Sequence, residues 1–363
     1  MKKILFLAQL PPPVHGASVM NQHVLNILKN SSYKTKIIEL RFVEDVAEIG
    51  SIKFNKLYKM FEIFFKILKA MINFKPEVAY FTLSPVGGAF YRDVFFVAIL
   101  KIFSVKIVYH LHGKGIKNNL SISWKKMLYR FVFRNSFVIH LSPILEQDIS
   151  SLGYKKIFFV PNGIEKLEFT NIIKKENKVP KLLFLSNLTI SKGLLVLIEA
   201  CKIMKEKKLD FELNIVGNEF DISVEQLNNE INNYGLEKNI NILGPKYGNE
   251  KYEILIKSDI LVFPTFYPNE CFPLIILEGM QFALPVVSTF EGAIPEIVDD
   301  GVTGFLVPPK DVISLAEKIE ILINNKNLRI QMGDAGRKKF LEKYTLDKLE
   351  MHIKKVFEEI GVS

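Results

Sequence analysis

The chain has 363 residues, of which 48% are hydrophobic and 24% charged, so it is long enough for two globular domains. Its net charge of +9 is unevenly placed, because residues 1–165 carry 23 Lys and Arg against 10 Asp and Glu, and the remainder carries 25 against 29. No stretch reaches the ~18 apolar residues of a membrane-spanning helix, and Cys201 and Cys271 match no metal or redox spacing.

The first half alternates short apolar runs with helical patterns, which indicates parallel βαβ units. The runs are continuous and do not alternate with polar residues, as is typical of strands covered on both faces. The expected strands are residues 3–8, 35–40, 78–82, 106–112, 136–141 and 157–160. The expected helices are residues 17–29, 54–73, 94–103 and 123–133.

Two stretches of this half combine positive charge with many aromatic and aliphatic residues. Residues 53–75 carry six Lys and only Glu62, and residues 101–134 carry eight Lys and Arg and no carboxylate. Apolar residues interleaved with lysine at helical spacing are typical of a helix on an anionic lipid surface; a core-packed helix with a solvated lysine face is the alternative. No nucleic-acid-binding motif accompanies the charge, so we expect no nucleic acid partner. We expect peripheral membrane contact through this half and a cytoplasmic location at the inner face of the cell membrane.

Two loops of the first half contain glycines that follow strands. Gly16 lies between the first strand and its helix, where it would let the backbone approach a bulky anion, although a simple turn glycine is the alternative. Gly113 and Gly115 form G-x-G after another strand, but Asn118 occupies the third glycine position. A dinucleotide site is therefore not expected there.

The second half repeats the α/β pattern after a polar linker at residues 170–181. The expected strands are residues 182–185, 212–216, 240–243, 260–263, 286–288 and 304–307. The expected helices are residues 194–207, 224–234, 249–258, 273–281, 294–298, 312–324 and a charged segment at 327–360. The sequence thus predicts two Rossmann-like, doubly wound domains facing across a cleft: residues 1–168, joined by a C-terminal helix at 346–363, and residues 169–345. Ligands in such sheets bind beyond the carboxyl ends of the strands.

Three charged side chains of the second half fall in such places. Lys192 precedes the helix that follows the strand at 182–185, and taken by itself it could be a surface lysine. Glu270 lies in the loop after the strand at 260–263. Pro273 suits the first position of the next helix, and Glu278 lies inside that apolar helix. A carboxylate there needs polar partners, such as the vicinal hydroxyls of a ribose. The alternative is an ordinary charge in the N-terminal part of the helix and a surface glutamate in the loop.

Glu270 and Glu278 form E-x7-E within residues 258–311, and this segment resembles the C-terminal half of family 4 retaining glycosyltransferases, the glycosyltransferase group 1 type with the GT-B fold. The resemblance implies that Glu278 binds the nucleotide ribose, Glu270 the donor sugar and Lys192 the diphosphate. Asn187 stands where the family usually has an arginine. His112 fits a family histidine near the donor sugar, or it is simply a strand-end histidine. The implied catalytic residues are His112, Lys192 and Glu270. The implied donor-binding residues are Gly16, Asn187, Lys192, Val216, Gly217, Pro245, Glu270, Cys271, Phe272, Pro273, Leu274, Ile275 and Glu278.

The resemblance also implies a hexosyltransferase-type reaction. A sugar would pass from a UDP sugar, in preference to a GDP sugar, to a glycan or polyprenyl-diphosphate-linked acceptor in capsule or O-antigen synthesis. The anomeric configuration would be retained, with the nucleotide sugar as co-substrate and no cofactor. The sequence has no D-x-D motif, so we expect metal independence. The alternatives are a sugar-nucleotide epimerase of the same fold and a silent binding module for anionic lipid or glycan.

Overall fold

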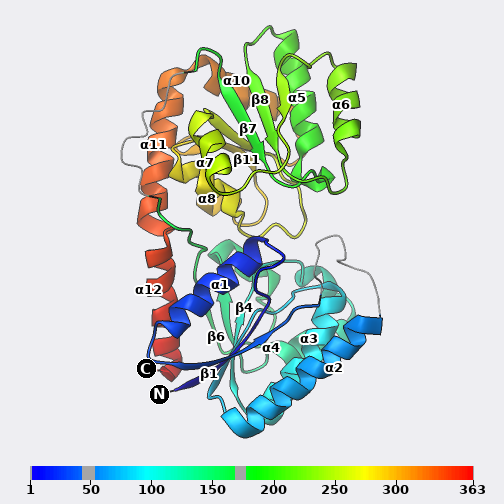
Figure 1. The fold of residues 1–363 in the computed structure, drawn as a ribbon, viewed down its shortest axis with the longest axis vertical. Coiled ribbons are helices and arrows are strands. Elements are labelled where there is room, and N and C mark those ends of the chain that lie inside the picture. Colours follow the sequence, from blue (N-terminus) through cyan, green and yellow to red (C-terminus); the bar gives the residue numbers. More distant parts are fainter. Residues whose placement is uncertain (1, 43–53, 168–176, 363) are drawn as a thin grey trace. The chain divides into compact units, whose positions relative to one another are not determined.

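The computed structural model of the chain describes residues 2–42, 54–167 and 177–362 (Figure 1). The chain divides into two compact units, Met1–Gly163 with Leu346–Ser363, and Ile164–Thr345. Each unit contains one six-stranded parallel sheet covered by helices, which confirms the predicted α/β class. The break between the units follows Gly163, ahead of the boundary expected after residue 168. Most of the expected linker lies outside the described residues.

The sheet of the first unit has the strand order β2-β1-β3-β4-β5-β6. Its strands are β1 (Lys3–Ala8), β2 (Lys34–Glu39), β3 (Val78–Phe81), β4 (Lys106–His110), β5 (Phe137–His140) and β6 (Lys156–Phe159). Its helices are α1 (Gly16–Lys29), α2 (Phe54–Lys69), α3 (Gly87–Ile102), α4 (Ser123–Phe133) and α12 (Leu346–Phe357), with shorter turns η2 (Ala70–Phe74), η3 (Lys117–Asn119), η4 (Pro143–Asp148) and η6 (Glu358–Val362).

The helices of the first unit form two layers. Helix α3 packs against both α2 and α4, whereas α1 packs against α12 (Figure 1). This arrangement follows from the right-handedness of crossover connections between parallel strands. The connections β2 to β3, β3 to β4 and β4 to β5 all step in one direction across the sheet, whereas the connection β1 to β2 steps in the other direction. The layer of α2, α3 and α4 therefore covers one face of the sheet.

Helix α3 begins earlier than the sequence indicated. It starts at Gly87, after Val86 in an extended capping conformation, whereas the expected helix started at residue 94. Glycines are poor helix formers, so the local pattern does not indicate a helix at Gly87 and Gly88. Tertiary contacts outweigh that preference, because the buried Asp93 accepts a hydrogen bond of 2.9 Å from the Ser84 N–H and pairs with Arg92 at 2.7 Å.

The sheet of the second unit has the order β12-β11-β10-β7-β8-β9. Its strands are β7 (Lys181–Leu185), β8 (Glu212–Val216), β9 (Ile240–Ile242), β10 (Ile260–Phe263), β11 (Val286–Thr289) and β12 (Gly304–Val307). Its helices are η5 (Ile190–Lys192), α5 (Leu194–Glu206), α6 (Val224–Asn233), α7 (Gly248–Lys257), α8 (Leu274–Gln281), α9 (Ile294–Ile297), α10 (Val312–Asn324) and α11 (Lys326–Lys343). The charged C-terminal segment, expected as one helical stretch, is divided between α11 and α12.

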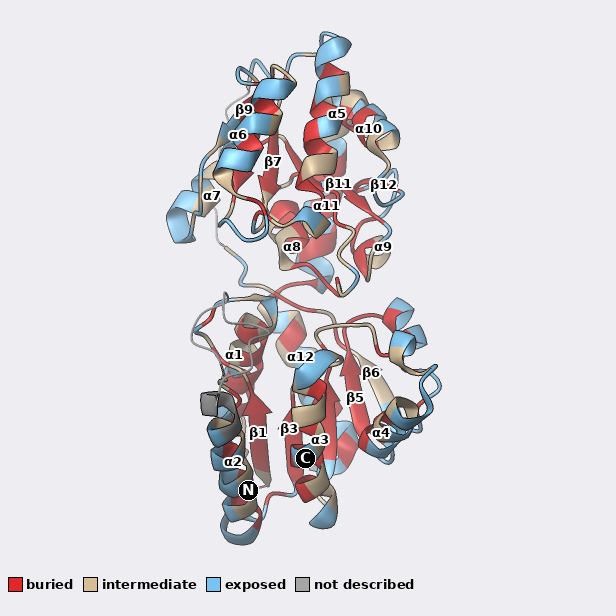
Figure 2. Cartoon of the chain, turned by 90° about the vertical axis from the view of Figure 1, so that its right-hand side faces the viewer, coloured by how far each residue is buried: buried red, intermediate tan, exposed pale blue. Residues whose placement is uncertain are grey.

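Each unit has its own hydrophobic core. In the first unit the core is built from strand residues and the inner faces of α2, α3 and α4. The core of the second unit lies between its sheet and helices such as α5, α6 and α10. Figure 2 shows buried strands in both sheets, with helices that are exposed on their outer sides. In the second sheet the strand order reverses between β7 and β10, so the loops after these two strands define a topological switch point.

Candidate functional site

Two charged side chains meet at the switch point of the second sheet. Lys192 ends η5 after β7, and Glu270 lies in the loop after β10. The Lys192 Nζ is 2.7 Å from the Glu270 Oε2, to which the Thr265 hydroxyl also donates a hydrogen bond of 3.3 Å. The ammonium group stands 4.6 Å from the centre of the Tyr267 ring. Only 21% of the Lys192 side chain and 9% of the Glu270 side chain are exposed, so the pair lies in a largely desolvated position.

The loops that carry this pair are tied together by backbone contacts. The Phe266 N–H donates to the Ser191 carbonyl at 2.8 Å. Gly193, which caps α5, has a φ of +82°, and a Cβ at this position would lie 2.0 Å from the Pro264 carbonyl oxygen. Only glycine fits both the left-handed backbone and the close approach. The glycine thus allows Lys192 and Glu270 to meet.

Gly193→Ala should destabilise the second unit far more than Gly244→Ala. Both glycines have positive φ, but a Cβ on Gly244 would meet nothing within 4 Å. We expect a loss of about 1 kcal/mol for Gly244→Ala, from backbone strain alone, and about 3 kcal/mol for Gly193→Ala, where a collision is added. Scanning calorimetry of the two variants measures this difference. Equal losses would show that the contact with Pro264 relaxes at no cost.

Glu278 forms a second ion pair, which the sequence did not predict. It lies in α8, and its Oε1 is 2.8 Å from the Nζ of Lys251 on α7. Both side chains are 22% exposed, so they remain partly hydrated and the pair is weak enough to exchange partners. Pro273 precedes α8 as its N-cap, with an extended ψ of 119°, and Leu274 is the first helical residue instead. The expected place of Pro273 inside the helix was therefore wrong by one position.

The remaining expected donor-binding residues of this unit lie at or beyond the carboxyl ends of β7, β8, β9 and β10, partly on loops, partly at the end of β8 and partly in the first turn of α8. Gly217 follows β8, and a Cβ there would lie 1.8 Å from the Ser186 carbonyl oxygen, so the loops after β7 and β8 touch. Among the expected residues, Asn187 and Pro245 are exposed, Leu274 and Ile275 are half-buried, and Val216, Cys271, Phe272 and Pro273 are buried. The structure thus places a lysine, two carboxylates and several backbone turns at this end of the sheet.

Gly16 and His112 belong to the first unit. Gly16 is exposed and opens α1, and His15 caps that helix: its Nδ1 accepts a hydrogen bond of 3.2 Å from the Ser18 N–H. The Ser18 hydroxyl in turn accepts one of 3.0 Å from the His15 N–H. The pair does not match the usual Ser/Thr-x-x-Glu/Gln pattern of a capping box, so the sequence did not indicate this motif. It gives the loop around Gly16 a fixed conformation.

His112 is one of three neighbouring histidines in the first unit. Its ring centroid lies 4.1 Å from that of His110, the last residue of β4, whose Nδ1 is 2.6 Å from the Tyr80 hydroxyl. His140 ends β5, and its Nδ1 accepts a hydrogen bond of 3.0 Å from the Leu141 N–H. The Nε2 atoms of all three rings are buried and have no hydrogen-bond partner among the residues that the structure describes.

Burial keeps these three rings neutral at pH 7. It lowers the pKa of His112 to about 3, an effect that the nearby His140 and His15 reinforce. It also lowers the pKa of His140 to about 3 and holds that of His110 well below its usual value. Sequence reasoning found His112 alone. His110 and His140 could have been noticed because they end two adjacent parallel strands. Within the described ranges, no group of three His, Cys, Asp or Glu side chains is placed to hold a metal ion.

Two doubly wound α/β units in one chain, each built on a six-stranded parallel sheet, are the architecture of the GT-B fold. Residues 165–339 match the model of the family "Glycosyl transferases group 1". This match covers just under half of the chain, and it shows that the second unit is of the group 1 glycosyltransferase type, as its E-x7-E segment had indicated.

Curated relatives and a solved structure agree with this assignment. The chain is 29% identical over 265 residues to an uncharacterized glycosyltransferase, MJ1178, of Methanocaldococcus jannaschii, covering 71% of this chain and 70% of that protein. It is 30% identical over 244 residues to the amylovoran biosynthesis glycosyltransferase AmsK of Erwinia amylovora, covering 65% and 58%. The chain spans 52 to 70% of the length of the first five curated relatives that it matches. The fold is similar to that of Anabaena HepE in complex with UDP-glucose, with a TM-score of 0.75 at 18% identity, covering 99% and 100% of the two chains.

Proposed function

We propose that the chain transfers a sugar from a nucleoside diphosphate donor, UDP in preference to GDP, to a glycan acceptor in polysaccharide synthesis, and that the acceptor is lipid-linked. The observation that carries the proposal is the contact between Lys192 and Glu270 at the switch point of the second sheet. A cation and a carboxylate held there suit the two parts of one donor, its diphosphate and its sugar hydroxyls. The names of AmsK and of the UDP-glucose complex of HepE support a polysaccharide product and a UDP donor.

On donor binding, each ion pair would exchange a protein partner for a donor group. Lys192 would turn from Glu270 to the diphosphate oxygens, which leaves the Glu270 carboxylate free to accept hydrogen bonds from sugar hydroxyls. The other pair would open in the same way, so that Glu278 accepts hydrogen bonds from the ribose. Free N–H groups in the first turn of α8 would add donors to the phosphate oxygens. Asn187 would donate hydrogen bonds where the family usually places an arginine.

We propose that the transfer retains the anomeric configuration. The acceptor hydroxyl attacks the anomeric carbon on the face that the nucleotide leaves, so a new C–O bond forms as the bond to the diphosphate oxygen breaks. The acceptor proton passes to the departing diphosphate oxygen. Lys192 stabilises the negative charge that develops there, which is catalysis by positioning and charge. We propose His112, neutral at pH 7, as a hydrogen-bonding group for the donor sugar, with no cofactor and no required metal.

The epimerase alternative predicts a different chemical outcome. An epimerase would convert a UDP sugar without any acceptor, whereas a transferase consumes the donor as the acceptor is glycosylated. The relatives named above carry transferase names and give no support to the epimerase. A proton NMR time course of the donor, with and without a polyprenyl-diphosphate glycan acceptor and with or without chelator, separates the two reactions and tests metal independence.

The matching donor should raise the melting temperature of the protein, and Glu278→Gln should remove most of this rise. A ligand at 100 times its Kd adds about 2.7 kcal/mol of stability, which in a unit of this size corresponds to about 5–10 °C. The neutral amide should weaken the affinity for the donor by about 10- to 100-fold, because the charge-assisted hydrogen bonds to the ribose hydroxyls are lost. Thermal scans with UDP, GDP and ADP sugars measure both effects.

The matched control for this prediction is Lys251→Met. It removes the partner that Glu278 has in the structure but leaves the carboxylate available, so donor-induced stabilisation should persist. If Glu278→Gln gave the same shift as the unchanged protein, Glu278 would not bind the ribose. If no sugar nucleotide shifted the melting temperature, the proposed donor class would be wrong.

A further inference from the structure

The layer of α2, α3 and α4 exposes an unusual number of large apolar side chains. No described helix is long and apolar enough to cross a membrane, yet each of these three helices has apolar residues on the side away from its sheet. A helix at the surface of a globular domain normally presents polar residues there. We call this outer surface of α2, α3 and α4 the aromatic face. Its exposed apolar residues are Tyr58, Phe61, Phe65, Phe95, Ile102, Trp124, Met127 and Phe131.

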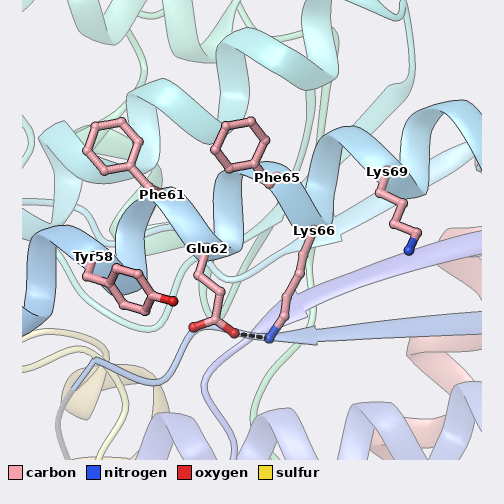
Figure 3. A pocket seen from close by; sticks show the side chains of 6 residues that line it. All are labelled: Tyr58, Phe61, Glu62, Phe65, Lys66 and Lys69. Carbon is pink, nitrogen blue, oxygen red and sulfur yellow. Dashed lines mark ion pairs between the residues drawn. The ribbon is translucent and has the colours of Figure 1, made fainter.

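Helix α2 has an apolar stripe on each of two sides. Its inner stripe contains the buried Ile63 and Ile67. On the outer side, Tyr58, Phe61 and Phe65 are 74%, 51% and 62% exposed. They line a hollow of about 390 Å³, together with Glu62 and two lysines (Figure 3). The inner stripe is sufficient to hold α2 on the sheet, so core packing does not explain the outer one.

The neighbouring helices extend the same surface. On α3, Phe95 and Ile102 are 56% and 78% exposed. On α4, Trp124 and Met127 are 52% and 66% exposed. The Trp124 ring also stacks on Tyr91 of α3, at 5.7 Å between centroids, which joins the two helices. Because α3 packs against both α2 and α4, the exposed residues share one face of the unit.

Positive charges accompany these apolar residues. On α2, Lys66 pairs with Glu62 at 2.5 Å and Lys69 lies one turn further along (Figure 3). The Lys101 ammonium of α3 stands 5.5 Å from the Phe131 ring of α4. Lysine stems can lie along apolar surface while their ammonium groups reach anionic head groups. A protein partner would need its own pattern of negative charge and apolar groups, whereas an anionic bilayer supplies both over any area.

We propose that the aromatic face rests on an anionic lipid bilayer, at the inner face of the cell membrane. The aromatic rings would enter the boundary between head groups and acyl chains, and Lys66, Lys69 and Arg130 would contact lipid phosphates. Tryptophan is favoured at this depth because its ring is apolar and its N–H needs a polar partner. The binding involves no residue of the donor site, so it can be tested apart from sugar transfer.

Trp124 is the protein's only tryptophan, which provides a label-free test. Vesicles of phosphatidylcholine mixed with phosphatidylglycerol should shift Trp124 fluorescence to shorter wavelength, and lipids brominated on the acyl chains should quench it. Vesicles of phosphatidylcholine alone should bind at least tenfold more weakly. High salt should weaken binding to the mixed vesicles. Lys192→Met should bind vesicles unchanged, so a failure of the donor site and a failure of this proposal can be distinguished.

Matched variants separate the roles of charge and apolar contact. Lys66→Gln with Lys69→Gln should weaken vesicle binding about fivefold per charge. The control is Lys202→Gln with Lys207→Gln in the second unit, where Lys202 also has a glutamate partner four residues away. Phe61→Ser with Phe65→Ser should weaken binding at least tenfold, and Phe220→Ser, 58% exposed in the second unit, should not.

Three results would overturn the proposal. The first is equal binding to neutral and mixed vesicles, and the second is no loss of binding in the variants of α2. The third is a self-associating protein that Phe61→Ser with Phe65→Ser converts to a monomer in analytical ultracentrifugation, because the aromatic face would then join two copies of this chain. Circular dichroism confirms that each variant is folded.

Discussion

Lys192→Met should lower kcat/KM for sugar transfer by about 10²- to 10³-fold, the usual cost of removing one group that stabilises developing negative charge. This corresponds to about 3–4 kcal/mol of lost transition-state stabilisation. Lys192 is placed for that role because it ends η5 at the switch point, next to the loop that carries Glu270. Steady-state rates at saturating acceptor, measured over a range of donor concentrations, test the prediction.

The same substitution should also destabilise the second unit, by about 2 kcal/mol, because among the residues that the structure describes it leaves the buried Glu270 carboxylate with only the Thr265 hydroxyl as a partner. Adding Glu270→Gln removes the uncompensated charge, so the double variant should regain most of the lost stability. It should not regain activity. Lys192→Arg, which keeps the charge, should retain more activity than Lys192→Met.

The double variant separates a structural role of Lys192 from a chemical one. If activity returned together with stability in Lys192→Met/Glu270→Gln, the lysine would serve only to hold its loop. If Lys192→Met were stable and active, the ion pair would have no part in either the fold or the reaction.

The course of the chain in the second unit could be predicted closely from the sequence because strands such as β10 and β12 are short, continuous apolar runs. β8, β10 and β12 have the expected bounds. The meeting of Lys192 and Glu270 also follows from the sequence in principle. Each residue comes after a strand, and parallel strands present their carboxyl ends at one edge of the sheet.

Other features depend on packing that the local pattern does not contain. Lys251 lies in a helix whose sequence resembles any solvated surface helix, and only the packing of α7 brings it to 2.8 Å from Glu278. The start of α3 at Gly87 depends on the contact of Asp93 with Ser84. The histidine cluster depends on the order of the first sheet, which places β4 beside β5. The ion pair of Lys251 and the histidine cluster depend on contacts between residues far apart in the sequence, whereas the start of α3 is accompanied by a contact nine residues along the chain.

The stability of the first unit should fall steeply as the pH drops from 6.5 to 5. An exposed histidine of the unfolded chain gains a proton below about pH 6.5, but His140 and His110 remain neutral in the folded unit because burial lowers their pKa values. The unfolded state therefore binds more protons, and each such histidine costs about 1.4 kcal/mol of stability per pH unit in this window. The same holds for His112, so His110, His112 and His140 together should cost about 6 kcal/mol by pH 5.

Local geometry supports the neutral state of His140. Its Nδ1 accepts the Leu141 N–H, so a second ring proton would place two donors against each other. His140→Asn offers an amide oxygen near the Nδ1 position and cannot titrate, so it should remove about a third of the pH dependence that the three histidines cause. The matched control is His352→Asn, at a half-buried ring in α12 whose pKa is also lowered by burial, and then by Lys348 and Lys355. His352→Asn should reduce the pH dependence by less than His140→Asn does, because the His352 ring keeps more contact with water.

Urea unfolding followed by Trp124 fluorescence measures this prediction, because Trp124 lies in the same unit as His110 and His140. The window from pH 6.5 to 5 lies above the ordinary pKa values of Asp and Glu, so histidines dominate the proton uptake there. A free energy of unfolding that stays constant across this window would mean that the three rings are charged or hydrated in the folded protein. His112 could then not be the neutral group that the proposed mechanism places beside the donor sugar.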